Sequence, residues 1–159
     1  MNKEKSLWDL LRSAVYKNDL SEVQRLVKHQ EHKTDNEFFM ECETEAESFL
    51  DALVMASGYG YINIVKFLLQ CGAYVDYKGL ASDNETALHK ASSNGDLEMV
   101  KLLIAHDAKI NARDDALNTP LHNAYNGNHE NVIEFLIAHG AQTDARNYEQ
   151  YIPSEMQSC

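Results

Sequence analysis

Thr86-Ala-Leu-His89 and Thr119-Pro-Leu-His122 are two copies of one short segment, 33 residues apart. The match continues downstream, where Leu102-Leu-Ile-Ala-His-Asp-Ala108 returns as Phe135-Leu-Ile-Ala-His-Gly-Ala141 at the same spacing. Self-similarity at a fixed period of this length indicates a stacked-repeat architecture, in which each unit packs only against its neighbours. The sequence therefore predicts a solenoid and not a domain built around one central core.

The period can be followed toward the N-terminus through one alanine of each unit: Ala124, Ala91, Ala56 and Ala14. The steps between these alanines are 33, 35 and 42 residues, so the earlier units carry insertions. Two extra residues fall in the loop 77–84 and nine fall within 29–48. Insertions in solenoids map to loops, because a loop tolerates added length at small entropic cost.

Each unit is predicted to contain two short antiparallel helices. The second helix carries an apolar stripe at positions i, i+3, i+6 and i+7, which in the third unit are Leu97, Val100, Leu103 and Ile104. One such helix pair cannot bury its stripe alone, so the units must stack. The fourth unit has Glu130 where the third has Leu97, which predicts a frayed or partner-covered edge.

The starts of the first helices are also marked in the sequence. Thr86 and Thr119 are expected to be N-caps, because a threonine hydroxyl accepts a hydrogen bond from a free backbone N–H of the first turn. Pro120 suits the first helical position, where its missing N–H would have had no partner. Asp9 and Asp51 hold the equivalent positions in the first two units, and we expect them to cap those helices in the same way.

The Thr-x-Leu-His start, the apolar run and the Gly-Ala end resemble the ankyrin repeat over most of the chain. This resemblance implies an all-α solenoid of stacked helix-turn-helix units with β-hairpin loops, forming a single domain over 1–159. The repeats would span about 9–50, 51–85, 86–118 and 119–151, with an acidic insertion at about 29–48 and a partial capping remnant at 152–159. It also implies a structural role for His89 and His122, whose ring nitrogens would bond loop backbone between repeats.

Composition limits the partners that we expect. The formal charge of −11 argues against nucleic acid, because binding phosphates needs a basic surface. It favours a protein partner with a basic patch instead. No apolar run is long enough to span a membrane, and the N-terminal segment does not resemble a signal peptide. The three cysteines are widely spaced, which fits reduced thiols and a cytoplasmic protein that could also enter the nucleus.

The insertion at 29–48 holds seven acidic residues and one lysine, Lys33. It is interpreted either as a solvated loop or as an acidic arm that docks on a basic partner. Phe38-Phe39-Met40 lies within this segment and either folds back onto the repeats or anchors a partner. A zinc site built from His29, His32 and Cys42 is disfavoured, because no fourth ligand is evident.

No catalytic, nucleotide-binding or metalloprotease motif occurs in the sequence, so we expect neither enzymatic activity nor a cofactor. Ankyrin-repeat proteins bind partners through hairpin tips and through the inner helices, and the resemblance places candidate contacts at equivalent positions. At the hairpin tips these candidates are Glu47, Ser82, Asp83, Glu85, Asp115, Asn118, Tyr148 and Tyr151. On the inner helices they are Tyr16, Lys17, Met55, Tyr59, Lys90, Ser93, Asn94, Asn123 and Asn126. Each could equally be an ordinary solvated side chain, so the prediction is stronger for the surface than for any member.

The predicted function is non-catalytic protein–protein interaction by a stand-alone regulator, inhibitor or adaptor. The length resembles that of stand-alone ankyrin regulators such as the cyclin-dependent kinase inhibitors. Two alternatives remain open: an accessory subunit of an enzyme complex, and a pathogen effector that binds host proteins. We expect a monomer, with self-association through the C-terminal edge as an alternative. The resemblance also makes Asn111 a candidate substrate for the asparaginyl hydroxylase that modifies ankyrin hairpins.

Overall fold

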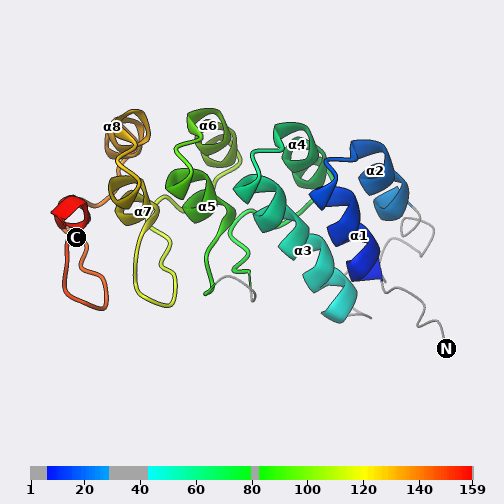
Figure 1. Cartoon of the computed structure of the whole chain (residues 1–159), viewed down its shortest axis with the longest axis horizontal. Coiled ribbons are helices and arrows are strands. Elements are labelled where there is room, and N and C mark those ends of the chain that lie inside the picture. Colours follow the sequence, from blue (N-terminus) through cyan, green and yellow to red (C-terminus); the bar gives the residue numbers. More distant parts are fainter. Residues whose placement is uncertain (1–6, 29–42, 80–82, 159) are drawn as a thin grey trace.

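The computed structural model describes residues 7–28, 43–79 and 83–158, and these form two rows of helices (Figure 1). The first row contains α1 (Leu7–Tyr16), α3 (Glu43–Gly58), α5 (Ala87–Ser93), α7 (Pro120–Asn126) and the short 3-10 helix η1 (Pro153–Ser158). The second row contains α2 (Leu20–Lys28), α4 (Ile62–Gln70), α6 (Leu97–Ala105) and α8 (Glu130–Ala138). The described ranges contain no β-strand. The predicted all-α repeat solenoid is confirmed.

Contacts between neighbouring units form a continuous core along both rows. In the first row α1 packs on α3, α3 on α5, α5 on α7, and α7 on η1. Leu53, Leu88 and Leu121 hold equivalent positions in successive helices of this row and are almost completely buried. In the second row Leu103 and Leu136 are fully buried in the same way. Burial of a repeated leucine at each interface stabilises the stack, since each buried leucine contributes roughly 1.5–3 kcal/mol.

The second-row helices follow the predicted apolar stripe. α8, however, begins at Glu130 and runs for 9 residues, the same length as α6. The replacement of leucine by Glu130 therefore does not shorten the helix. A glutamate in the first turn interacts favourably with the positive end of the helix dipole, which stabilises the helix start without an apolar residue there.

The starts of the first-row helices divide into two groups. Thr86 and Thr119 are the N-cap residues of α5 and α7, and Pro120 is the first residue of α7. Asp9 and Asp51, in contrast, lie inside α1 and α3, so the expected capping role of these two aspartates is wrong. The first two units lack the Thr-x-x-His pair. Their helices begin before the position that the N-cap residue holds in α5 and α7.

The acidic insertion is also partly helical. α3 begins at Glu43, so residues 43–48 of the expected loop belong to a 16-residue helix. Glu47 therefore lies in a helix and not at a hairpin tip, which corrects its predicted placement. Residues 43–48 read Glu-Thr-Glu-Ala-Glu-Ser, and alanine and glutamate favour helix. Residues 29–42, with Phe38-Phe39-Met40 and the disfavoured zinc ligands, lie outside the described residues, as does Ser82.

The loops between units project from the first row of helices on one side of the molecule (Figure 1). Asp114 N–H donates to Asn118 O at 3.1 Å, and Asn147 N–H donates to Tyr151 O at 3.0 Å, closing two equivalent turns. Successive loops are also joined, since Tyr148 N–H donates to Ala116 O at 2.8 Å. The loops therefore lie against one another as the helices do.

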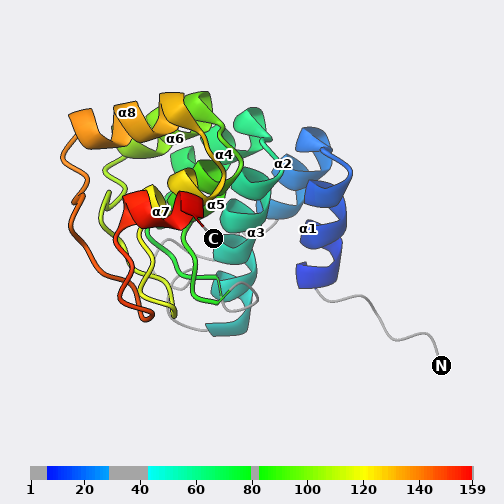
Figure 2. The ribbon, with the colours of Figure 1, turned by 60° about the vertical axis from the view of Figure 1, so that its left-hand side comes forward.

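The C-terminal end of the stack is covered by η1. This short helix packs against α7, at the place that a first-row helix of a further unit would occupy (Figure 2). Pro153 is buried in the contact. In the second row, the side chain of Ile137 on α8 is 40% exposed, whereas the equivalent Ile104 on α6 is partly buried.

Candidate binding surface

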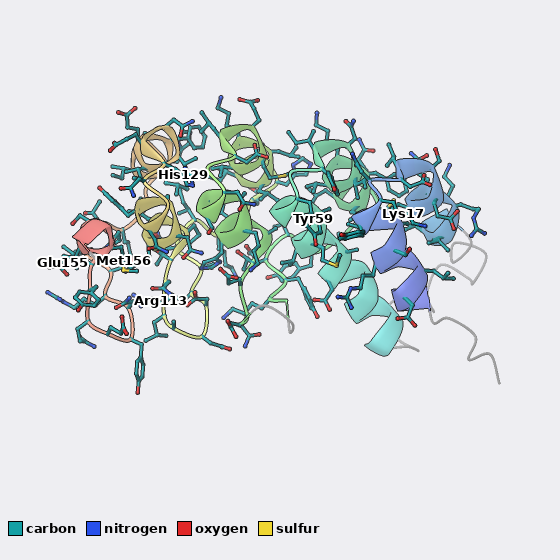
Figure 3. All side chains as sticks on the ribbon, viewed as in Figure 1. Lys17, Tyr59, Arg113, His129, Glu155 and Met156 are labelled. Carbon is teal, nitrogen blue, oxygen red and sulfur yellow. The ribbon has the colours of Figure 1, made fainter. Side chains whose placement is uncertain are left out.

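We call the inner face the surface made by α1, α3, α5 and α7 together with the loop residues 75–79, 83–86, 108–119 and 142–152. Most of the predicted contact residues that the structure describes belong to this face. Figure 3 shows side chains along it, with Lys17 and Tyr59 at the ends of adjacent first-row helices and Arg113 in a loop. The structure separates these residues into those that join repeats and those exposed to solvent.

Two buried histidines, His89 in the third unit and His122 in the fourth, each join their own unit to the loop that follows it. Thr86 N–H donates to His89 Nδ1 at 3.2 Å, which leaves the proton on Nε2 to donate to Asn118 O at 3.1 Å. His122 repeats this arrangement with Thr119 N–H at 3.1 Å and Tyr151 O at 3.1 Å. Burial lowers the pKa of both rings, so they are neutral at pH 7. Neutral, fully bonded rings of this kind hold the loops and are not poised for catalysis.

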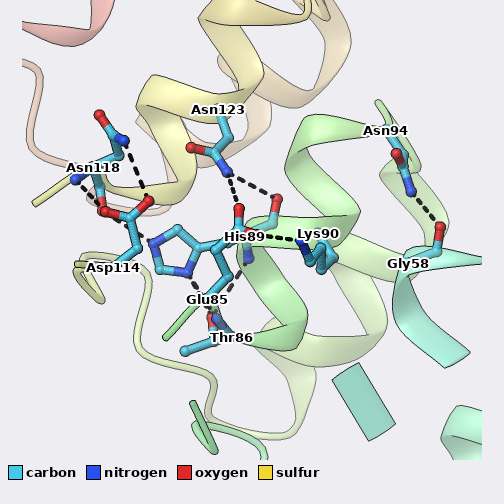
Figure 4. A network of polar contacts seen from close by, with 9 residues as sticks. All are labelled: Gly58, Glu85, Thr86, His89, Lys90, Asn94, Asp114, Asn118 and Asn123. Carbon is cyan, nitrogen blue, oxygen red and sulfur yellow. Dashed lines mark hydrogen bonds and ion pairs between the residues drawn. The ribbon is translucent and has the colours of Figure 1, made fainter. Parts of the chain in front are cut away.

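A second polar network joins the third and fourth units on the inner face (Figure 4). Lys90 forms an ion pair with Glu85, and Asn123 Nδ2 donates to the other oxygen of Glu85 at 3.0 Å. Asn94 Nδ2 donates to Gly58 O at 2.6 Å, which connects the second and third units. The side-chain donors of both asparagines are therefore bonded within the protein, although Asn94 is exposed, and these four predicted contact residues join neighbouring repeats.

The loops contain buried polar residues that the sequence reasoning missed. Asp114 accepts hydrogen bonds from Asn118 N–H at 2.8 Å and from its Nδ2 at 3.2 Å. Asn147 accepts from Tyr151 N–H at 2.9 Å and donates to Asn118 Oδ1 at 3.0 Å. Asp114 and Asn147 are 8% and 4% exposed and lie 33 residues apart. The repeat period was the signal that could have identified them as a structural pair.

Two arginines, also one period apart, extend along the loops. Arg113 Nη1 donates to Leu117 O at 3.2 Å and to Arg146 O at 2.7 Å. Arg146 Nη1 donates in turn to Gln150 O. The two guanidinium groups satisfy loop carbonyls, which fixes the loops in their stacked arrangement.

His129 lies in the turn between α7 and α8 of the fourth unit and contacts the equivalent turn of the third unit. Its Nε2 lies 2.9 Å from Ser93 O, and its ring occupies the space beside two glycines. A Cβ atom at Gly95 or at Gly127 would lie 2.4 Å from a ring nitrogen of His129. The two glycines therefore create the site for this ring, and the sequence reasoning did not detect the connection.

Tyr16, Tyr59 and Tyr61 form a cluster in the first two units, which we call the aromatic corner. The rings of Tyr16 and Tyr59 are 6.0 Å apart at an angle of 85°, and those of Tyr59 and Tyr61 are stacked at 5.5 Å. Tyr16 remains 69% exposed and Tyr59 51% exposed. Tyr61 was not among the predicted contacts. The corner therefore offers two perpendicular aromatic surfaces to solvent.

The other predicted contacts vary in exposure. Asp83, Asp115, Ser93, Asn126 and Lys17 are exposed, and Met55 is partly buried beside the core. Tyr148 and Tyr151, in the last loop, are 76% and 39% exposed. Asn111 is partly buried. Its side-chain amide donates to Gly140 O at 3.2 Å, and its side-chain oxygen accepts from Gln142 N–H at 2.8 Å.

Charge is distributed unevenly along the stack. Residues 83–158 contain twelve acidic and five basic side chains, whereas residues 7–28 contain three acidic and four basic ones. All five basic side chains of the C-terminal half have partners within the protein: Lys90, Lys101, Lys109, Arg113 and Arg146. Most of the carboxylates have no ion-pair partner among the described residues, so this half presents uncompensated negative charge.

In the parts of the chain that the structure describes, no group of three or more His, Cys, Asp or Glu residues is arranged to hold a metal ion. Within the same parts, no helix combines the length and the apolar character needed to cross a membrane. Cys71 lies at the C-cap of α4 and is partly buried.

Comparison with known proteins agrees with this architecture. The sequence matches the family described as ankyrin repeats (3 copies) over residues 11–114 and 53–147. It is also similar to the human ankyrin repeat domain-containing protein 17, with 35% identity over 78 residues, which are 49% of this chain. The matched part is 3% of that much longer protein. The family match spans most of the chain, and its repeats coincide with the stacked helix pairs of the structure; the chain belongs to the ankyrin-repeat family, whose repeats are protein–protein interaction modules and are generally non-catalytic.

Proposed function

We propose that this protein is a regulator, inhibitor or adaptor that binds a protein partner with a basic surface patch through its inner face. The observation that carries the proposal is the uncompensated negative charge of residues 83–158, in which every basic side chain is already paired within the protein. A surface of this kind attracts a basic partner and increases the rate of their encounter.

The loops give this charge a position. Asp83, Asp115 and Glu149 are exposed residues of successive loops. The loops 108–119 and 142–152 are held by buried histidines and by arginine–carbonyl hydrogen bonds, and Asp115 N–H donates to Asp83 O at 3.0 Å. The backbone that carries these carboxylates is therefore held in place before a partner arrives. A surface organised in advance loses less conformational entropy on binding.

The proposal can be tested by affinity capture from lysate at low and high salt, with mass spectrometry of the retained proteins. The test variant carries Asp83→Asn, Asp115→Asn and Glu149→Gln, which remove three charges from the loops and keep the side-chain shapes. The matched control carries Glu98→Gln, Glu130→Gln and Glu134→Gln, which remove three charges from the exposed side of the second-row helices.

We expect a retained partner with a basic surface, released as salt rises, and lost from the loop variant but kept by the helix control. Equal retention by the two variants, or retention that salt does not affect, would contradict the proposal. Either result would show that the loop carboxylates do not guide binding.

We further propose a cytoplasmic location, with the nucleus as a second one. Its support is the wide spacing of the three cysteines in the sequence, which shows no paired pattern. Fluorescence microscopy of the tagged chain in its own cells tests this, and a signal confined to a secretory compartment would contradict it.

A further inference from the structure

We propose that the aromatic corner formed by Tyr16, Tyr59 and Tyr61 is a binding site for an arginine side chain of the basic partner. This inference rests on the proposed function and adds the position and the chemistry of one anchoring contact. Ring faces carry partial negative charge and attract a guanidinium group, which stacks on them and keeps its hydrogen-bond donors free.

The first support is the geometry of the rings. Tyr16 and Tyr59 meet at 85°, and Tyr61 stacks on Tyr59 at an angle of 29°. The stacked partner fixes the orientation of Tyr59, while 69% of Tyr16 and 51% of Tyr59 stay accessible. Two perpendicular rings of this kind form the corner of an aromatic cage for a cation.

The second support is the field of the helix ends. α1 ends at Tyr16 and α3 ends at Gly58, directly before Tyr59. The C-terminal end of a helix carries partial negative charge and stabilises a nearby cation. Neither helix has a basic residue in its last turn, so a cation from a partner would meet this field at the corner.

The third support is the presence of an oxygen acceptor at the same turn. Asp96 accepts Met99 N–H through Oδ1 at 3.0 Å, while Oδ2 would lie 3.3 Å from a Cβ atom at Gly60. This carboxylate therefore reaches the turn between Tyr59 and Tyr61. Guanidinium groups need such acceptors around their edge.

One native cation is close to the site. Lys17 follows Tyr16 directly, and its charge acts on Glu22 of α2. The hydrogen bond from Arg25 lowers the pKa of Glu22, and the charge of Lys17 adds to this effect. Glu22 forms its ion pair with Arg25, and the carboxylate that an incoming arginine would meet at the corner is that of Asp96.

The test uses the whole chain and a defined probe, a blocked peptide of sequence Gly-Arg-Gly-Arg-Gly. The control probe replaces both arginines with citrulline, which has nearly the same shape and no charge. Tyrosine ring signals of the protein are followed by NMR during titration. We expect the arginine peptide to shift the ring signals of Tyr16, Tyr59 and Tyr61, and the citrulline peptide to leave them unchanged.

The matched variants are Tyr59→Leu and Tyr74→Leu, because the two tyrosines are similarly exposed and Tyr74, just after α4, lies outside the corner and outside the inner face. We expect Tyr59→Leu to weaken binding of the arginine peptide by between about twofold and thirtyfold, and Tyr74→Leu to leave it unchanged. Tyr16→Phe, which keeps the ring, should bind as the unmodified chain does. Circular dichroism verifies that each variant is folded.

Shifts confined to the acidic loops, or equal effects of the two tyrosine substitutions, would overturn the inference. The same variants applied to a captured partner separate it from the proposed function. A partner that still binds through the loop carboxylates, with the same affinity for Tyr59→Leu, would leave the proposed function intact and remove the arginine site.

Discussion

At the scale of single residues, the buried histidines hold the repeats together. His89 is completely buried and bonds both Thr86 N–H and Asn118 O, which lie in successive units. We expect His89→Leu to lower the free energy of unfolding by about 1–3 kcal/mol, because it leaves the buried Thr86 N–H without a partner and removes the bond to Asn118 O in the next loop. Urea denaturation measures the change. The exposed His106 is the control, and His106→Leu should change stability by less than about 0.5 kcal/mol. Equal losses would contradict this assignment.

The same histidines give stability a pH dependence. Burial lowers the pKa of His89 and His122, so below about pH 6.5 the unfolded chain binds protons that the folded chain does not. The stability contributed by the neutral rings is therefore present above this pH and decreases as pH falls from about 6.5. We expect the fall between pH 7.5 and 5.5 to be smaller in His89→Gln than in the unmodified chain. Urea midpoints at both pH values measure it, and an equal fall in the two proteins would be inconsistent with this origin.

At the scale of elements, the turn between α7 and α8 depends on how His129 fits beside Gly127. Gly127 has φ −83, which alanine adopts without strain, so the ring of His129 is the main obstacle to a side chain there. We expect Gly127→Ala to destabilise the protein by about 1–3 kcal/mol. In a His129→Ala background the same substitution should cost little or be stabilising. A double-mutant cycle by urea denaturation measures the coupling, and additive effects would argue against this packing.

The elements also show how far the sequence could be interpreted. The second-row helices were predicted well, because their apolar stripe recurs at a fixed period and burial follows it. The start of α3 was not predicted, because residues 43–48 are as highly charged as a solvated loop. Charge alone does not distinguish a loop from a helix. The capping of α5 could be predicted from Thr86 and His89, but the same logic failed at Asp9 and Asp51, where no histidine completes the motif.

The contacts that the candidate residues make within the protein were predicted less well than the fold. Family position placed Glu85, Lys90 and Asn123 on the inner face, and the structure shows that they bond one another across the third and fourth units. Sequence position identifies the face on which a side chain lies but not its hydrogen-bond partner in the next repeat. The aromatic corner was found only in part for the same reason, because Tyr61 joins it through a stacking contact.

At the scale of the whole molecule, the C-terminal end of the stack depends on η1. This helix covers α7, whose Leu121 is completely buried. We expect a chain that ends at Ile152 to unfold at a lower urea concentration, and its newly exposed edge to promote self-association. Urea denaturation and light scattering measure the two effects. Unchanged stability together with an unchanged mass would mean that η1 is not a cap.

The central claim is that the inner face of the stack is the surface that binds a protein partner. The most direct test is hydrogen–deuterium exchange of the whole chain, alone and in complex with the partner retained in the salt-dependent capture experiment. We expect slower exchange in the complex in the loops 108–119 and 142–152 and at the C-terminal ends of α1 and α3. Exchange in the second-row helices should be unchanged. Protection confined to α2, α4, α6 and α8 would contradict it.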